Sequence, residues 1–266
     1  MPLARAADGV AINYDVRGAG EPLLLLAGQS NNHRWWDSTR TGFDEHFTTI
    51  ALDWRGTGGS DKPDDDSYSI AGFAADAIAV LDDAGVERAH VYGTSMGGRV
   101  AQILAADYPG RVDRLVLGCT SPGDRHGVRR QGDVNVALTQ RDGAAVRRAL
   151  LELMYTPEWL AENAGPYYVI GDPAMPAYAR AGHLKASRRF DGWEALLRID
   201  APTLLIHGAD DRLSPAANAS LLAERIPGAK AEVIAGARHA YFEEYRSVAT
   251  PLVLDFLGVG KRPAPA

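Results

Sequence analysis

The sequence predicts an α/β fold in which a mostly parallel β-sheet carries helices on both faces. Short, nearly continuous apolar runs recur along the chain, and such runs are typical of strands that are buried on both faces. Helical patterns lie between these runs, and strands that alternate with helices favour a parallel sheet. The apolar runs lie at residues 22–27, 48–52, 89–92, 114–117, 202–206 and 231–234, and the helical patterns at 70–84, 96–108, 215–225 and 247–257.

Turn-forming residues mark the ends of several of these elements. Gly85 follows the first helical pattern and Pro109-Gly110 follows the second, and both are good signals for the end of a helix. Near the N-terminus, residues 9–16 are followed by a turn at Gly18-Ala19-Gly20. This segment predicts a strand at the edge of the sheet that forms an antiparallel hairpin with the next strand.

The alternation stops at residues 121–199, which contain helical pieces and several aromatic side chains but no buried-strand run. An insertion of this length predicts a helical cap after the sixth strand, over the carboxyl ends of the strands, where open α/β sheets bind ligands. We expect residues 1–120 and 200–258 to form the α/β core and residues 121–199 to form a cap within the same domain. Residues 259–266 should form a flexible tail.

Composition and charge argue against several classes of partner. The chain has 266 residues, of which 46% are hydrophobic and 23% charged, and a net charge of −6 without a basic stripe. We therefore expect a globular protein that does not bind nucleic acid. The N-terminus lacks a signal-peptide pattern, the apolar runs are too short to span a bilayer, and the single cysteine, Cys119, fits a reducing compartment. We expect a cytoplasmic location with no membrane partner, and the sequence leaves open whether the protein forms a homodimer.

The most informative motif is Gly93-Thr94-Ser95-Met96-Gly97, which joins a predicted strand to a predicted helix. A serine on such a turn has a strained backbone and an exposed hydroxyl, and the residues two before and two after it must be small because they nearly touch. The helix that follows directs its free N–H groups and the positive end of its dipole toward any anion that forms there. The motif predicts that Ser95 is a nucleophile.

A serine hydroxyl needs a base to remove its proton, and the base needs a carboxylate to orient it. In a hydrolase of this fold the three residues follow strands in the order serine, acid, histidine. Of the seven histidines, only His239 lies just past the last predicted strand, so we expect it to be the base. The acid should follow the run at 202–206, where Asp210 and Asp211 are both candidates.

These motifs resemble the α/β-hydrolase superfamily, most closely the enol-lactonases and the cofactor-free haloperoxidases. In that superfamily the acid ends a Gly-x-x-Asp sequence four residues before a proline, a pattern that Gly208 to Asp211 and Pro215 match. The resemblance therefore implies that Asp211 is the acid. The loop at 53–61 also resembles the family's Asp-x-Arg-Gly-x-Gly-x-Ser sequence, and we interpret it as a structural turn beneath the site.

An oxyanion hole needs two backbone N–H groups that point at the carbonyl oxygen as it becomes tetrahedral. One is expected from Met96, the residue after the nucleophile, and the other from Gln29, in the loop after the run at 22–27. The family usually has His-Gly-x at this loop, where the histidine braces the loop, whereas this chain has Ala27-Gly28-Gln29. Residues that we expect to line the substrate pocket are Gly28, His33, Trp35, Trp36, Tyr155 and Trp159.

The sequence therefore predicts a serine hydrolase that cleaves a small-molecule carboxylic ester or lactone through an acyl-enzyme. The aromatic side chains of the cap and of the loop at 30–36 favour a substrate with an apolar or aromatic group. No cofactor and no metal are expected, because the sequence shows no metal-ligand spacing. The alternatives are hydrolysis of carbon–carbon bonds in ring-cleavage products, perhydrolase or haloperoxidase-like activity, and a non-catalytic receptor with this fold.

Overall fold

The computed structural model describes residues 1–259, so the expected tail lies outside the described residues except for Val259. The described chain contains an eight-stranded sheet in the order β1-β2-β4-β3-β5-β6-β7-β8. Strands β3 to β8 run parallel to one another, which confirms the predicted mostly parallel sheet. The strands are β1 (Leu3–Arg5), β2 (Ala11–Gly18), β3 (Glu21–Leu26), β4 (Phe47–Leu52), β5 (Ala89–Thr94), β6 (Val112–Gly118), β7 (Thr203–Gly208) and β8 (Lys230–Ile234).

The predicted hairpin between the N-terminal strand and the next strand is wrong. Strand β2 pairs antiparallel with β4 rather than with β3, and β1 pairs antiparallel with β2 at the edge. The link from β2 to β3 passes across the beginning of β4, where Cβ atoms on Gly18 and Gly20 would lie 2.3 Å from the Phe47 carbonyl oxygen and 2.4 Å from that of His46. The glycines therefore allow a close crossing, with φ of 71° and 130°, rather than a tight turn.

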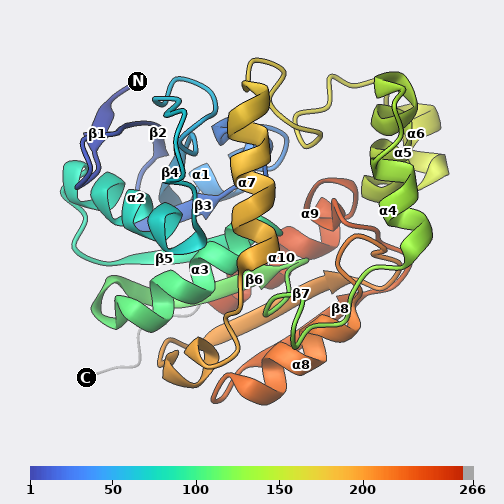
Figure 1. Cartoon of the computed structure of the whole chain (residues 1–266). Coiled ribbons are helices and arrows are strands. Elements are labelled where there is room, and N and C mark those ends of the chain that lie inside the picture. The colour runs from blue at the N-terminus through green and yellow to red at the C-terminus, as the bar shows by residue number, and fades with distance from the viewer. Residues whose placement is uncertain (260–266) are drawn as a thin grey trace.

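Helices cover both faces of the sheet, as Figure 1 shows. The alternation of side chains along β3 separates two cores, because Leu24 and Leu26 pack with α2, α3 and α8, whereas Leu23 and Leu25 pack with α1, α9 and α10. The helices of the α/β core are α1 (Thr41–Asp44), α2 (Ile70–Asp83), α3 (Met96–Asp107), α8 (Ala217–Arg225), α9 (Tyr241–Glu244) and α10 (Arg246–Leu257), with short 3-10 turns η1 (His33–Trp36) and η2 (Pro109–Arg111).

The insertion after the sixth strand is confirmed, because four helices and a 3-10 turn lie between β6 and β7. These elements are α4 (Gly132–Leu138), α5 (Gly143–Met154), α6 (Pro157–Glu162), α7 (Ala177–Arg189) and η3 (Ala195–Arg198). Figure 1 shows α4, α5 and α6 grouped together, while α7 runs separately toward α3 and β6. Within residues 1–259, the chain forms no helix of the length and apolar character that a bilayer crossing needs.

Candidate active site

Ser95 stands at the sharp turn between β5 and α3, with φ of 55° and ψ of −119°. Only small residues fit around this turn. A Cβ atom on Gly93 would lie 2.3 Å from the Gly97 carbonyl oxygen, and a Cβ atom on Gly97 would lie 2.2 Å from the Leu26 carbonyl oxygen. The two glycines therefore let the turn close on itself and let the start of α3 lie against the end of β3.

Two hydrogen bonds to the end of β6 and the residues after it hold this strained serine in place. The Ser95 N–H donates to the Gly118 carbonyl oxygen at 2.9 Å, and the Ser95 carbonyl oxygen accepts from the Thr120 hydroxyl at 2.8 Å. The Ser95 side chain is half-buried. A left-handed, non-glycine residue held in this way is a frequent feature of functional sites.

A buried pair of side chains supplies an acid and a base after β7 and β8. His239 Nδ1 and Asp211 Oδ2 are 2.7 Å apart, and both residues are almost fully buried. The other carboxylate oxygen of Asp211 accepts from the N–H groups of Leu213 at 2.8 Å and Ser214 at 2.9 Å. Asp210 is exposed. The structure thus pairs Asp211, and not Asp210, with the imidazole.

The environment of His239 makes its imidazole a stronger base. Burial opposes a charge on the ring, but the adjacent Asp211 carboxylate and the Cys119 side chain together outweigh this effect and raise the pKa of His239 well above its ordinary value. With Nδ1–H donated to Asp211, the ring nitrogen Nε2 is the one left to accept a proton from a nucleophile.

Cys119, which follows β6, is a neighbour of this site that the sequence did not reveal. Its buried thiol interacts with both the His239 ring and the Ser95 N–H, and burial raises the pKa of the thiol. Since β5, β6, β7 and β8 are parallel and consecutive neighbours in the sheet, the residues that follow them lie together at the carboxyl ends of the strands. Cys119 could have been placed there only once β6 was known to lie between β5 and β7.

The predicted oxyanion donors lie on the two segments that meet at the sharp turn around Ser95, which we call the serine elbow. Gln29 follows β3 and Met96 begins α3, whose Gly97 touches the end of β3. Neither the Gln29 N–H nor the Met96 N–H donates a hydrogen bond to any group in residues 1–259. Two free N–H groups on adjoining segments are what an oxyanion hole requires, although this role for them remains a prediction.

The loop that carries Gln29 packs against the indole ring of Trp35. A Cβ atom on Gly28 would lie 2.5 Å from the Trp35 ring, and Trp35 Nε1 donates to the Thr94 hydroxyl at 2.9 Å. Trp35 therefore spans the space between the oxyanion loop and the residue before the nucleophile. Its side chain is 2% exposed, which indicates that it supports the site from beneath.

The other residues expected in the substrate pocket differ in exposure. Trp36 and Tyr155 have no exposed surface: Trp36 packs on Tyr92, and Tyr155 stacks on Trp159 with ring centroids 4.1 Å apart. Trp159 and His33 are half-buried and remain the more accessible members of this group. The pocket assignment stays a prediction, and burial favours supporting roles for Trp36 and Tyr155.

His33 is hydrogen-bonded to the buried carboxylate of Asp53, in the loop that follows β4. Its Nδ1 lies 2.6 Å from Asp53 Oδ1, and its backbone N–H donates to the same oxygen at 2.9 Å. Asp53 Oδ2 accepts from Asn13 Nδ2 and the Gly59 N–H. Although burial opposes its charge, these hydrogen bonds lower the pKa of Asp53. The motif loop at 53–61 thus ties the oxyanion loop to the core.

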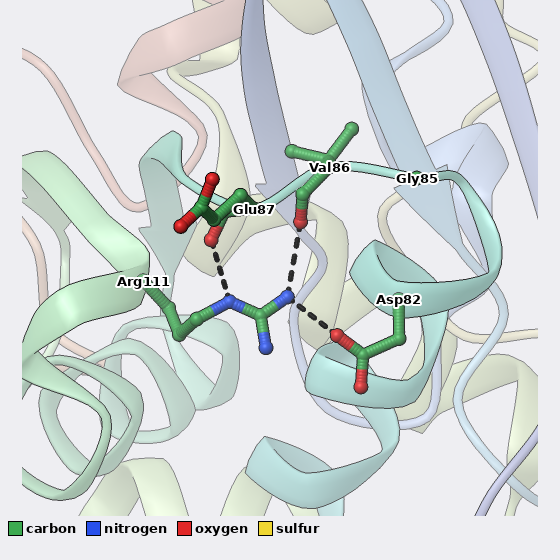
Figure 2. Close-up of a pocket in the computed structure, with 5 residues that line it drawn as sticks. All are labelled: Asp82, Gly85, Val86, Glu87 and Arg111. Carbon is green, nitrogen blue, oxygen red and sulfur yellow. Dashed lines mark hydrogen bonds and ion pairs between the residues drawn. The ribbon is translucent and has the colours of Figure 1, made fainter.

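A surface hollow lies at the opposite edge of the sheet, where β5 and β6 begin. Figure 2 shows Arg111 reaching across it to the carbonyl oxygens of Glu87 at 2.6 Å and Val86 at 3.0 Å and to the Asp82 carboxylate at 2.7 Å. Since the guanidinium is already hydrogen-bonded to three groups of the protein, we interpret this hollow as a structural feature and not as part of the active site.

A mostly parallel sheet with a serine elbow after its fifth strand, a cap after its sixth and an acid–histidine pair after the last two defines an α/β hydrolase. Residues 21–245 match the family described as alpha/beta hydrolase fold, and the chain belongs to this family. It is therefore a member of a hydrolase family, as the motifs predicted.

The chain is similar to proteins that include one curated relative and two solved structures. It is 32% identical over 266 residues, covering 97% of this chain and 98% of the relative, to the "Putative carbamate hydrolase RutD" of Azorhizobium caulinodans. The solved structure of Est816, described as an N-acyl homoserine lactone degrading enzyme, is similar with a TM-score of 0.81 and 30% identity, covering 96% of this chain and all of that one. The enol-lactonase of Burkholderia xenovorans LB400 has a TM-score of 0.82 at 23% identity, covering 96% and 99% of the two chains, a likeness that shows the fold.

Proposed function

We propose that this protein is a serine hydrolase that cleaves carboxylic esters or lactones, with Ser95 as nucleophile, His239 as base and Asp211 as the orienting acid. The observation that carries the proposal is the strained Ser95 backbone, with φ of 55°, at the same sheet edge as the buried His239–Asp211 pair. A strained serine elbow and a buried acid–base pair each cost stability, and serine acyl transfer uses both.

In this mechanism the Ser95 hydroxyl attacks the substrate carbonyl carbon while its proton passes to Nε2 of His239. Asp211 keeps Nδ1–H oriented and stabilises the imidazolium that forms. The imidazolium then gives the proton to the leaving oxygen, which breaks the ester bond and leaves an acyl group on Ser95. A water molecule, deprotonated by His239, attacks the acyl carbon and releases the carboxylic acid product.

The Gln29 and Met96 N–H groups are assigned the role of stabilising the negative charge on the oxygen of the tetrahedral intermediate. Both are free of other hydrogen bonds within residues 1–259, and Met96 begins a 12-residue helix. The N-terminal end of that helix adds a positive dipole contribution at the same place. Donors that are fixed before reaction stabilise the transition state more than the bound substrate, which raises kcat.

The apolar character of the cap supports a substrate with a hydrophobic acyl or alcohol group. Half-buried apolar side chains of the cap join the cluster that contains the residues after β8, together with Leu213, which lies two residues after the acid. These side chains are Leu150, Leu151, Trp159, Leu160, Tyr167 and Ile170. Burying a ring or alkyl chain among them would contribute about 25 cal/mol per Å² of apolar surface.

Lactones are favoured by the likeness to Est816, whose description names an N-acyl homoserine lactone as its substrate. A lactone adds one requirement to the mechanism. Its leaving alcohol stays attached to the acyl group, so the site must hold a single hydroxyacyl group on Ser95 until water attacks the acyl carbon and releases the hydroxy acid.

Carbamate hydrolysis is a second candidate, favoured by the full-length likeness to proteins named as carbamate hydrolases. The same residues would then attack a carbamate carbonyl. Matched aryl acetates and aryl carbamates with one leaving group separate the two candidates. A kcat/KM higher for the carbamate would make carbamate hydrolysis the preferred function.

The proposal is tested with a fluorophosphonate probe and a substrate panel. We expect the probe to label the native protein and not Ser95→Ala, and we expect turnover of aryl esters, enol-lactones or N-acyl homoserine lactones. Failure of the folded native protein to react with the probe and with every activated ester would overturn the enzyme assignment in favour of a non-catalytic receptor.

A further inference from the structure

Ser30, the residue after Gln29, is held in a left-handed conformation by the cap. Its φ is 60°, a value that non-glycine residues rarely adopt. The Ser30 N–H donates to His183 Nδ1 at 3.2 Å, and the Ser30 carbonyl oxygen accepts from the Asp172 N–H at 2.7 Å. Both backbone groups of this residue are therefore bonded to the cap.

His183 lies on α7 and has no exposed surface. Its second ring nitrogen, Nε2, lies 2.9 Å from the Arg55 carbonyl oxygen. Because that oxygen can only accept, Nε2 carries the proton and Nδ1 is the acceptor that the Ser30 N–H requires. The ring thus bridges the oxyanion loop and the loop that follows β4.

The surroundings of His183 keep this tautomer in place. The ring packs against Phe73, with centroids 4.8 Å apart, and against Tyr68 at 5.6 Å. Burial lowers the pKa of His183 to about 4, so the ring stays neutral at physiological pH. A second proton would occupy Nδ1 and leave the Ser30 N–H without an acceptor.

A neighbouring part of the cap docks on the same loops. The Gly171 N–H donates to Asn31 Oδ1 at 2.9 Å, and the Asp172 carboxylate accepts from the Gly58 N–H at 2.6 Å. The cap residues at 171–172 and His183 therefore hold the oxyanion loop from two separate segments. Both segments are hydrogen-bonded to Ser30, the residue directly after Gln29.

We propose that His183 is a positioning residue, which fixes the direction of the Gln29 N–H by holding the Ser30 backbone, so that a docked cap completes the oxyanion hole. This inference rests on the proposed function, because it assigns Gln29 to oxyanion stabilisation. The His183 side chain acts through the loop and does not touch the substrate.

Two substitutions separate the two hydrogen bonds of the ring. In His183→Asn, the amide oxygen lies near the position of the His183 Nδ1 atom and can still accept from the Ser30 N–H. In His183→Gln, the amide nitrogen reaches the Arg55 carbonyl oxygen, but no acceptor takes the place of Nδ1. We expect kcat for an activated ester to fall about 10²-fold in H183Q, with KM changed less than about threefold, and to stay within about tenfold of the native value in H183N.

The affinity of an aryl trifluoromethyl ketone provides a second measurement, because its adduct with the nucleophile carries an oxyanion. We expect this affinity to fall in H183Q in parallel with kcat/KM and to be largely kept in H183N. If H183Q does not fold, His183→Leu, which fills a similar volume without an acceptor, takes its place with the same expectation.

Tyr178→Phe is the matched control, because Tyr178 lies on the same helix and its hydroxyl donates to the Lys62 carbonyl oxygen at 2.9 Å, away from the oxyanion loop. We expect Y178F to keep kcat within about twofold of the native value. Equal losses of kcat in H183Q and H183N, or a loss in Y178F as large as in H183Q, would overturn the inference. Failure of the proposed function would look different, since the native protein would then lack esterase activity altogether.

Discussion

The two halves of the candidate active site are held in place in different ways. Ser95, Asp211 and His239 follow strands of the sheet, and their hydrogen bonds come from neighbouring core loops. The loop that carries Gln29 is bonded to the cap as well as to the core, since the Ser30 N–H donates to His183 of α7, 153 positions further along the chain. The nucleophile and the acid are thus fixed within the core, whereas the loop that carries Gln29 is also bonded to the cap.

This difference predicts that changes in the core and changes in the cap have effects of different size. Loss of a triad residue removes chemistry that the rest of the site cannot replace. Loss of a cap contact displaces a donor that is otherwise intact, so the effect should be smaller and confined to kcat. The four substitutions below are ordered by the size of the expected effect.

Ser95→Ala should have the largest effect. Without the hydroxyl no acyl-enzyme forms, and we expect kcat for an activated aryl ester to fall by about 10⁴-fold to 10⁶-fold. The measurement is steady-state release of the phenol. Ser220→Ala, at an exposed serine on α8, is the control and should keep native kcat. Comparable activity in S95A and S220A would show that the nucleophile lies elsewhere.

Asp211→Asn should lower kcat by about 10⁴-fold. It should also change the pH dependence, because the Asp211 carboxylate raises the pKa of His239. Protonated His239 cannot accept a proton, so kcat/KM of the native protein should be lost as pH falls through that raised pKa. In D211N burial lowers the pKa of His239, and the residual activity should persist to lower pH.

Asp210→Asn is the matched control for this prediction, because Asp210 is exposed and adjacent in sequence. We expect D210N to keep the native pH profile and kcat within about twofold. A pH profile that shifts in D210N and not in D211N would transfer the role of the acid to Asp210.

Gln29→Pro should have an intermediate effect, because it deletes one oxyanion N–H and leaves the triad intact. We expect kcat to fall by about 10²-fold to 10³-fold with a small change in KM. Gln29→Ala retains the N–H and should keep kcat within about threefold. If Q29A loses as much kcat as Q29P, with both variants folded by circular dichroism, the side chain rather than the N–H is the functional group.

Tyr155→Phe should have the smallest effect on catalysis and act on stability. The Tyr155 hydroxyl donates to the Glu243 carboxylate at 2.5 Å, which joins the end of α5 to α9. Its removal leaves a half-buried carboxylate oxygen without this donor, so the free energy of unfolding should fall by about 1 kcal/mol. Urea unfolding measures this change, with the more exposed Tyr178→Phe as the comparison. An unchanged midpoint in Y155F would show that this bond does not anchor the cap.

Much of the core could be predicted from local patterns. Strands buried on both faces give continuous apolar runs, and the short distance between Gly93 and Gly97 follows from the elbow motif itself. The edge hairpin was mispredicted because Gly18 and Gly20 are needed for a close crossing at the beginning of β4 and not for a tight turn. A local sequence pattern does not distinguish these two uses of glycine.

The support of the oxyanion loop could not be predicted for a different reason. The family usually has a bracing histidine where this chain has Ala27, and the sequence does not show which residue supports the loop in its place. The structure places His183 and Asp172 of the cap against Ser30, but these contacts depend on how a helical insertion docks on the core. Sequence periodicity identifies helices in an insertion and gives no information about that docking.

Ser95 is proposed to carry the acyl group, and rapid quenching of the reaction with an aryl ester, followed by mass spectrometry of the digested protein, measures this directly. We expect an acyl adduct on the peptide that contains Ser95, and we expect it to be absent in S95A. An adduct on Cys119, whose thiol lies against both Ser95 and His239, or product formation with no adduct on Ser95 in the native protein, would contradict it.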